Sequence, residues 1–400
     1  MARLLAPLVA LLLVSAGVAA VPTTGISGNA SGGSTVAATG PPTTVTNSTA
    51  RMAIDAPART GQGTAGTSLS AALSEHGEAL RSSHEVLSME RAFEARPEDD
   101  RSDLLISELI DIERRIEALR TTQRRTMAAY ANGSVSESTL LTRFARIDGT
   151  ARELDRRLDS VWDLTNRLGI TYLDSRLRQA EALTGSMKGP VRSAVADRLA
   201  AGRSLPSVHV EATGDALVLA AIDGDDYVRE SVFLPNLQSE GDRELTSAIG
   251  ALAQTERFYP WATEHRTSNY LVGTPGSLYR VEFTHQHGRL QVSLGARTGQ
   301  VFREIQRLDL PKLPTTTVRT VENDVFRVTF ERTYRGGPMR VSVSAVETGD
   351  PVDATVAFGN RTVRETGADG VAWVVEPRAG YSLTVIGDGA TATLNVSAAN

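Results

Sequence analysis

Apolar residues recur at alternating spacings of four and three along two stretches of the 400-residue chain. The first stretch runs from Leu105 to Leu119, and the second, from Leu140 to Leu168, continues for four heptads. Such spacing places one apolar stripe along a helix, as in the seam of a coiled coil. Between them, Ala131–Gly133 favours a helix end and Ser134–Glu137 has the form of a capping box. The pattern predicts two long helices that fold back as an antiparallel hairpin.

A third and weaker helical pattern, from Leu69 to Arg96, precedes this hairpin. We expect it to pack beside the hairpin through four apolar residues, Leu73, Leu80, Leu87 and Phe93. Residues 68–202 would then form a helical coiled-coil hairpin or bundle. Either the third segment or a second copy of the chain could cover the longer stripe. We favour the internal bundle, while a homo-oligomer formed through the helices stays open.

The first residues, Met1–Ala20, have the composition of a secretory signal peptide. Arg3 supplies the positive charge, an apolar run follows, and the small residues 18–20 fit a cleavage site. We therefore expect residues 1–20 to be removed and the protein to be secreted or held at the cell surface, without a membrane span. Retention of this segment as an anchor helix is the alternative. Residues 21–67 are mostly Gly, Ser, Thr, Ala and Pro, which predicts a disordered linker.

Two β-rich segments follow the helices. In residues 203–311, strands joined by tight turns surround one helix at 242–258, which predicts a small α+β sandwich. In residues 315–400, short alternating strands are separated by glycine-containing turns, a pattern typical of an all-β Ig-like sandwich. The sequence thus predicts a multidomain α+β protein with helical, α+β and all-β domains in that order.

Composition and motifs exclude several classes of function. The chain has no cysteine, which excludes disulfides, thiolate metal sites and thiol catalysis. Its formal net charge is −5, without the basic excess of a nucleic-acid-binding protein. The sequence has no nucleophile motif, P-loop or dinucleotide fingerprint. We expect no catalytic residues, no cofactor and no nucleic-acid partner. Of the 42 basic residues only Lys188 and Lys312 are lysines, so arginine will make most ion pairs.

Two pairs of residues are weak candidates for binding a metal ion, His285 with His287 and Asp223 with Asp225. The two histidines share one face of a predicted strand, where Glu282 or His265 could complete a Zn²⁺ or Cu²⁺ site. The two aspartates lie in a predicted hairpin turn and could offer oxygens to Ca²⁺. We favour the structural alternatives, a polar strand end and an ordinary turn, and expect no essential metal.

Five asparagines stand in the sequence Asn-X-Ser/Thr and are candidates for N-glycosylation: Asn29, Asn47, Asn132, Asn360 and Asn395. All five fall where we expect linkers, loops or strand ends. We therefore expect them to be accessible at the surface of an exported protein.

Part of the middle segment resembles the second half of a PepSY domain. The residues concerned are the strand 278–283, the turn His287-Gly288, the strand 289–294 and the hairpin 296–301. The resemblance implies a secreted or membrane-associated protein, and some PepSY domains inhibit proteases as propeptides.

Two further resemblances concern larger parts of the chain. The stretches 350–356, 366–370 and 377–381 are similar to transthyretin-like or carboxypeptidase-regulatory Ig-like modules, which act as spacers, stabilisers or adhesive units. The whole arrangement, with the stretches 227–230, 259–262 and 301–306 between a helical hairpin and an Ig-like end, resembles secreted haloarchaeal proteins of no assigned activity.

These observations favour an exported, non-catalytic protein of the cell surface or extracellular space, which acts by binding or as a structural spacer. A regulator or inhibitor of an extracellular peptidase is the first alternative, implied by the PepSY resemblance, and an enzyme of unknown class is the third. The expected partners are proteins of the envelope or a peptidase.

Overall fold

The computed structural model describes residues 41–54, 57–64, 69–203, 207–237, 242–274 and 278–397. They belong to one compact unit. The signal peptide predicted for residues 1–20 and the candidate glycosylation site Asn29 lie outside the described residues. Within these ranges, no helix combines the length and the apolar character needed to cross a bilayer.

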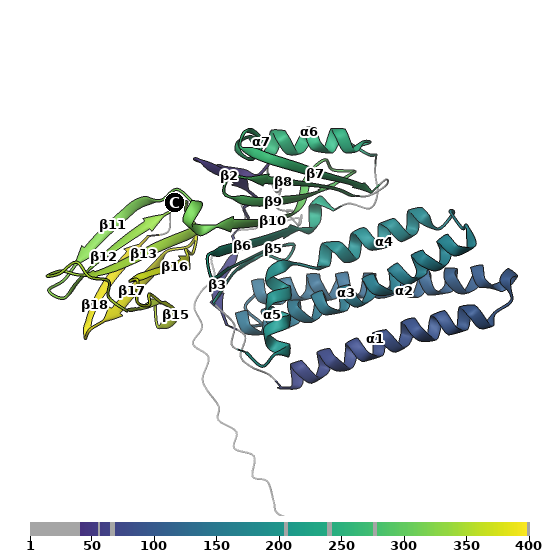
Figure 1. Ribbon diagram of the computed structural model, residues 1–400, viewed down its shortest axis with the longest axis horizontal. Coiled ribbons are helices and arrows are strands. Elements are labelled where there is room, and N and C mark those ends of the chain that lie inside the picture. The colour runs from purple at the N-terminus through teal and green to yellow at the C-terminus, as the bar shows by residue number, and fades with distance from the viewer. Residues whose placement is uncertain are drawn as a thin grey trace, which may run out of the picture. The chain divides into compact units, whose positions relative to one another are not determined.

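The helical segment contains the two long helices that the heptads predict. Its helices are α1 (Leu69–Ala95), α2 (Glu98–Ala131), α3 (Glu137–Leu168), α4 (Asp174–Met187) and α5 (Pro190–Ala200) (Figure 1). α3 is capped by Ser136, whose hydroxyl accepts a hydrogen bond from the Thr139 amide, and not by Ser134 as the capping-box pattern suggests. It ends at Gly169 in the left-handed conformation that glycine adopts without strain.

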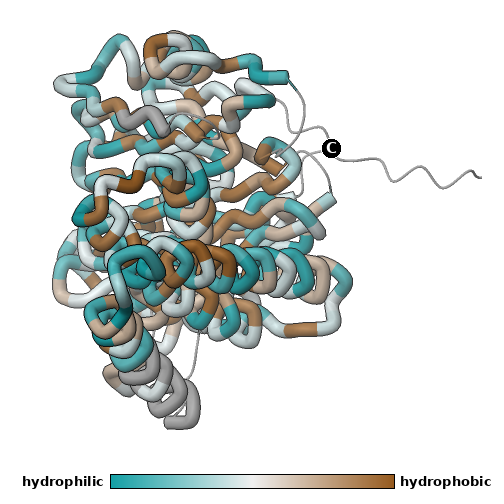
Figure 2. Tube along the Cα trace, turned by 90° about the vertical axis from the view of Figure 1, so that its right-hand side faces the viewer, coloured by the Kyte–Doolittle hydropathy of each residue, from teal (hydrophilic) through white to brown (hydrophobic). Residues whose placement is uncertain are grey.

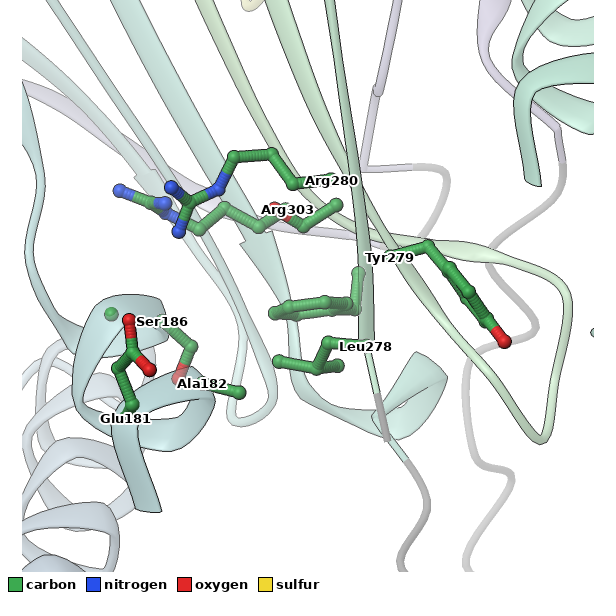
Figure 3. Close-up of a pocket in the computed structure, with 10 residues that line it drawn as sticks. Glu181, Ala182, Ser186, Leu278, Tyr279, Arg280 and Arg303 are labelled. Atoms are coloured by element: carbon green, nitrogen blue, oxygen red, sulfur yellow. The ribbon is translucent and has the colours of Figure 1, made fainter. Parts of the chain in front are cut away.

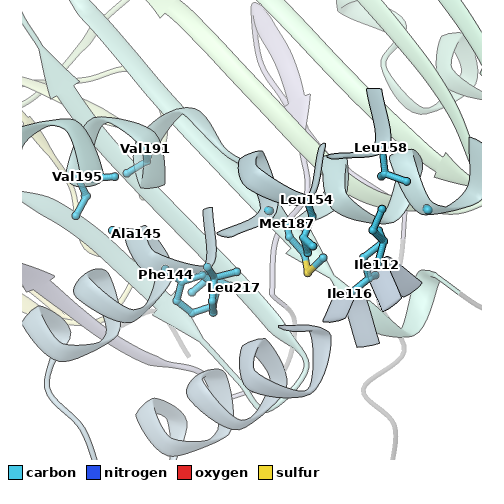
Figure 4. Packing of buried hydrophobic residues seen from close by; sticks show 14 of the residues in the cluster. Ile112, Ile116, Phe144, Ala145, Leu154, Leu158, Met187, Val191, Val195 and Leu217 are labelled. Carbon is cyan, nitrogen blue, oxygen red and sulfur yellow. The ribbon is translucent and has the colours of Figure 1, made fainter. Parts of the chain in front are cut away.

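The long apolar stripe of α3 is buried within a single chain. Leu154 and Leu158 are only 2% and 3% exposed. Figure 4 shows both leucines in one core with Met187 of α4 and Val191 of α5. α3 contacts α1, α2, α4 and α5, whereas the sequence predicted a cover of two helices. The stripe is longer than α2 and α1 can cover, and the two short helices that follow α3 cover the remainder.

α1 packs through other residues than those expected. Phe93 is buried as predicted, but Leu87 is 53% exposed, and Met89 lies in the core instead. The side chains of Leu73 and Leu80 are outside the described set. Hydrophobic and hydrophilic residues follow one another around each turn of the helices (Figure 2).

The expectation of a disordered linker at 21–67 is wrong for residues 43–51 and 59–63, which form strands and a turn. β1 (Thr43–Val45) and β2 (Ser48–Arg51) form a hairpin, and β3 (Arg59–Gly63) pairs with a strand of the central sheet. β2 is buried along its whole length. Backbone pairing and burial offset the ordering entropy that composition alone would leave uncompensated.

The glycines of β3 are required for close packing and not for flexibility. A Cβ at Gly63 would lie 2.7 Å from Cβ of Glu137 on α3, and one at Gly61 would overlap the carboxylate of Glu137. Only a strand without side chains at these positions can approach the helix so closely. The glycines whose abundance suggested a linker are therefore required here for close packing.

An eight-stranded antiparallel sheet forms the centre of the described unit, in the order β3-β4-β5-β6-β10-β9-β8-β7. Its further strands are β4 (Val208–Ala212), β5 (Ala216–Asp223), β6 (Asp226–Phe233), β7 (Arg266–Thr274), β8 (Leu278–His285), β9 (Gly288–Gly295) and β10 (Val301–Asp309). The sheet is larger than the predicted α+β sandwich because β3 comes from the N-terminal segment.

Helices lie on both faces of this sheet (Figure 1). α4 and α5 contact one face, and α6 (Ala248–Phe258) and α7 (Pro260–Glu264) contact the other. α6 begins later than predicted, after its cap Ser247, and Ile249 is 77% exposed. The buried positions of α6 are Ala251, Gln254 and Thr255, and Leu252 and Phe258 pack against the same core while partly buried.

The C-terminal segment is a sandwich of two four-stranded antiparallel sheets, β11-β12-β13-β16 and β15-β14-β17-β18. Its strands are β11 (Thr316–Glu322), β12 (Phe326–Arg332), β13 (Pro338–Ala345), β14 (Thr355–Phe358), β15 (Arg361–Glu365), β16 (Val371–Val375), β17 (Tyr381–Gly387) and β18 (Ala390–Val396). Apolar residues of both sheets form a core of their own. The predicted Ig-like sandwich is confirmed, with β11 and β15 as strands that the alternation did not predict.

Candidate functional site: an arginine-lined pocket beside buried ion pairs

The two central strands of the sheet carry the same dipeptide at their middle, Arg229-Glu230 in β6 and Arg303-Glu304 in β10. Successive side chains of a strand point to opposite faces, so each dipeptide places one charge on each face. The antiparallel register brings Glu304 opposite Ser231 and Arg303 opposite Val232. As a result, these two strands place Arg229 and Glu304 on one face of the sheet and Glu230 and Arg303 on the other, and all four are buried.

On the face covered by α6 and α7, Glu304 is fully paired. Its carboxylate accepts hydrogen bonds from Arg229 Nη1 at 2.7 Å, the Tyr259 hydroxyl at 2.7 Å and the Met52 amide at 2.8 Å. Gln306 donates to it as well, at 3.0 Å. Burial, together with the negative charge of Glu304, raises the pKa of Tyr259 well above its usual value, so the phenol remains a donor. This layer joins β2, α7 and the sheet.

On the face covered by the helical segment, Arg192 of α5 pairs with Glu230 of β6. Arg192 Nε donates to Glu230 Oε1 at 2.8 Å, and the two side chains are 1% and 2% exposed. A Cβ at Gly189 would overlap the Glu230 carboxylate, and the Gly189 amide donates to Asp148 at 2.7 Å. The corner between α4 and α5 is thereby fixed on the sheet.

Arg303 continues this layer toward a small cavity. Its guanidinium donates to the carbonyl oxygen of Lys188, at the end of α4. Burial lowers the pKa of Arg303 to about 10; the charges of Arg192 and Arg280 add to this, and Glu230 opposes it. Arg303 therefore lies near two other arginines, Arg192 and Arg280. The carboxylate of Glu230, which could neutralise it, is already paired with Arg192.

A pocket of about 70 Å³ lies between α4 and the strands β8, β9 and β10 (Figure 3). Its polar lining residues are Glu181, Ser186, Arg280, Ser293 and Arg303. In Figure 3 the side chains of Arg280 and Arg303 run side by side toward α4, where Glu181 stands opposite them. The sequence analysis did not predict this group of residues. The signal that could have indicated it is the presence of charged residues within otherwise apolar strands.

The structure brings the predicted histidine pair together with His265 around one aromatic ring. Trp261 stacks between His265 and His287, with ring centroids 4.4 and 4.6 Å away, and meets His285 edge-on at 5.4 Å. Burial lowers the pKa of His285 to about 4, and the neighbouring histidines add to the effect. Among the described residues, no three potential ligand side chains converge to hold a metal ion.

The predicted aspartate pair lies at the turn between β5 and β6. Asp223 forms an ion pair with Arg198 of α5 at 3.0 Å, and the Asp225 carbonyl oxygen accepts a hydrogen bond from the Leu310 amide at 2.8 Å. Asp225 also lines an open pocket of about 590 Å³ that the C-terminal sandwich shares. Both residues therefore have structural contacts in a tight turn.

Four candidate glycosylation sites lie within the described residues, and each asparagine is exposed: Asn47, Asn132, Asn360 and Asn395. Asn47 has a φ of 54° at the β1–β2 turn. Asn132 follows α2, and its side-chain oxygen accepts a hydrogen bond from the Ser134 amide at 3.0 Å. Their exposure agrees with the expectation from the sequence and does not show that any of them carries a glycan.

Three family models match the chain. Residues 1–204 match a domain of unknown function, DUF7096, and residues 208–314 match a family of unknown function, DUF7094. Residues 317–394 match an archaeal fibronectin-III type-like domain, which agrees with the sandwich of β11–β18 and supports an archaeal Ig-like module. None of these descriptions is that of a catalytic family.

The boundaries of the matches follow the structure, except that β3 lies within the first match and pairs in the sheet of the second. A search of curated proteins finds no match to the chain. The first model covers 204 of the 400 residues, and the chain therefore belongs to the DUF7096 family.

Proposed function

We propose that this protein is exported and acts without catalysis, as a rigid spacer and binding protein at the cell surface or outside the cell. The observation that carries the proposal is the junction between the central sheet and the C-terminal sandwich. A spacer must hold its two ends at a fixed separation, which needs an ordered junction instead of a flexible linker.

Apolar side chains from both parts form a small core at this junction. Leu308, Leu310 and Leu313 pack with Val375 of β16 and with Tyr227 of β6, and all five are buried. Packed leucines therefore occupy the segment that connects the central sheet to the C-terminal sandwich. Burial of apolar surface on this scale favours one relative orientation of the two parts.

Hydrogen bonds from side chains to backbone oxygens surround this core. Arg51 Nη2 donates to the Arg335 carbonyl at 2.6 Å, and Gln62 Nε2 donates to the Val375 carbonyl at 3.1 Å. Arg378 Nη1 donates to the Ile54 carbonyl at 3.1 Å. The strands of the N-terminal segment thus contact the C-terminal sandwich directly, 284 residues apart in the case of Arg51.

The absence of cysteine makes rigidity directly measurable. We expect a chain with the two substitutions Asn132→Cys and Asn360→Cys, spin-labelled at both, to give one narrow distance distribution. Both positions are exposed: Asn132 directly follows α2, and Asn360 lies in the turn between β14 and β15 of the C-terminal sandwich. The same pair with the added substitution Val375→Asp, which places a charge in the junction core, should give a broad distribution. A broad distribution in the parent chain would overturn the spacer role.

Export is tested separately at the N-terminus. We expect the protein from its native cells to begin near Val21 and to occur outside the cytoplasm, because Met1–Ala20 has the pattern of a signal peptide. Mass spectrometry of the intact protein from envelope and medium fractions measures both. A cytoplasmic protein that keeps residues 1–20 would contradict the proposal.

A second candidate function is regulation of an extracellular peptidase, as the resemblance of residues 278–301 to a PepSY domain implies. One observation favours it, since β7 is the outer strand of the sheet and its residues 266–270 are exposed. An outer strand can pair with an extended peptide segment of a partner. Inhibition of a panel of secreted peptidases by the purified protein tests this, and Thr267→Pro, which removes an edge amide, should weaken it.

A further inference from the structure

Three side chains with hydrogen-bond donors stand in a row across neighbouring strands. The register pairs Ser293 of β9 with Arg280 of β8 on one side and with Arg303 of β10 on the other. Adjacent strands are about 4.8 Å apart, so the three residues follow one another at that spacing on the same face. The row Arg280–Ser293–Arg303 lies at the floor of the pocket below α4 (Figure 3).

The two arginines of the row are not neutralised by carboxylates. Within the described residues, Arg280 makes no ion pair, and the hydrogen bond of Arg303 goes to a carbonyl oxygen. Glu230 is near Arg303 but is already bound by Arg192. Glu181 is the one acidic residue among those that line the pocket. Two guanidinium groups that face a common space repel each other, and an anion between them removes the repulsion.

The pocket has room for a small ion. Its volume of about 70 Å³ is several times what one ordered water molecule requires, so a tetrahedral oxyanion fits in it. The Ser293 hydroxyl, placed between the two arginines, adds a third donor at the point where such an ion would lie.

We propose that the pocket binds a phosphate group, held by Arg280, Ser293 and Arg303. The guanidinium groups donate to its oxygens as planar forks, which is the geometry in which arginine binds phosphate. At neutral pH inorganic phosphate retains a hydroxyl, and Glu181 opposite the row accepts a hydrogen bond from it. A phosphate monoester, whose second pKa is about 6, carries this hydroxyl in weakly acidic solution. A sulfate ion has no proton to donate and would face Glu181 with repulsion. The proposal is independent of the spacer role.

Titration calorimetry of the full chain at constant ionic strength tests this site, with inorganic phosphate, phenyl phosphate and sulfate as probes. We expect saturable binding of phosphate with a dissociation constant of about 1 mM or lower. Arg280→Gln should weaken it about tenfold, because one charge-assisted contact is lost. The exposed position of Arg280 makes the variant safe for folding, which thermal unfolding verifies.

Arg307→Gln is the matched control. Arg307 is exposed on the same strand and the same face as Arg303 but does not line the pocket. This variant should bind phosphate as the parent chain does. Equal weakening by Arg280→Gln and Arg307→Gln would mean attraction to general surface charge and would overturn the site, as would the absence of saturable binding.

Two comparisons define the ligand further. Glu181→Gln should reduce the preference for phosphate over sulfate, and equal affinity of the parent chain for both ions would overturn the assignment of phosphate. Binding of phenyl phosphate as tight as that of inorganic phosphate would identify a phosphate ester as the source. Binding of the inorganic ion alone would identify free phosphate. Both of these outcomes support the site and separate its two sources.

Discussion

Arg192 Nε and Glu230 Oε1 are 2.8 Å apart in a place where neither side chain is more than 2% exposed. Removing one partner of such a pair leaves a buried charge without compensation. We expect Arg192→Met to lower the free energy of unfolding by about 3–5 kcal/mol. Replacing both residues, with Arg192→Met and Glu230→Leu, should recover most of that loss. Denaturant titration measures the three proteins.

Arg327→Met is the control for this prediction. Arg327 and Glu322 also form an ion pair, at 2.7 Å, but the side chains are 50% and 46% exposed. Solvent screens such a pair, so its loss should change the free energy of unfolding by less than about 1 kcal/mol. Equal effects of Arg192→Met and Arg327→Met would contradict the importance of burial.

The same substitution should have opposite effects at two glycines. Gly189→Ala brings a Cβ into the Glu230 carboxylate, so we expect it to destabilise the protein and separate α5 from the sheet. Gly77 lies in α1 with open space around the position of a Cβ. Gly77→Ala should therefore stabilise the protein by about 0.5–1 kcal/mol through helix propensity. Thermal unfolding of both variants gives the two signs, and a loss of stability for Gly77→Ala would be inconsistent with this account.

The seam of α3 is a core within one chain, and a charge there should unfold the helical segment. We expect Leu154→Asp or Leu158→Asp to reduce helical circular dichroism, because both leucines are nearly inaccessible to water. Leu87→Asp, at a position 53% exposed, should leave the signal unchanged. Sedimentation of the full chain distinguishes the alternative: a folded, helical monomer of Leu154→Asp from a dimeric parent would place the seam between two molecules.

Stability should depend on pH through His285. Its pKa is about 4 in the folded protein because of burial, against the usual 6.5 of an exposed histidine. Between these values the unfolded chain binds more protons, so the free energy of unfolding falls as the pH is lowered from about 6.5 to about 4. The shift corresponds to a loss of about 3 kcal/mol. His287, whose pKa burial also lowers, acts in the same direction.

His285→Phe should flatten this pH dependence, while His84→Gln, at an exposed position of α1, should leave it intact. The difference between the parent chain and His285→Phe in denaturant titrations at several pH values above 4.5 isolates the contribution of His285, because other titrating groups are common to both proteins. Below that range Glu211 contributes as well: burial would raise its pKa, but the hydrogen bond and charge of His209 lower it to about 2. An unchanged slope in His285→Phe would show that another group causes the dependence.

Local sequence signals predicted the elements whose stability is local. The heptads from Leu140 to Leu168 predicted α3 because a helix repeats its contacts every three or four residues. The alternation in Val325–Phe330 and Tyr381–Ile386 predicted strands β12 and β17 of the C-terminal sandwich for the same reason, with a period of two. These periods are visible without knowing the partner of each element.

Composition misled where a residue acts through a distant partner. Gly61 and Gly63 suggested a flexible linker, yet they form part of β3 because Glu137, more than 70 residues later, lies against them. In the sequence, Ile249 and Leu252 fall on one side of α6, yet Leu252 packs against the core while Ile249 is 77% exposed. A single element does not specify which of its faces a remote segment will cover.

The sequence by itself determined the order of the segments, their helical or strand character and the exclusion of thiol chemistry. The tertiary structure alone decided that Arg280, Ser293 and Arg303 form one row and that His265 joins His285 and His287 around Trp261. Register between strands and contact between layers bring these residues together. Both depend on the global packing of apolar surface and on the pairing of buried charges, which have no periodic trace in the chain.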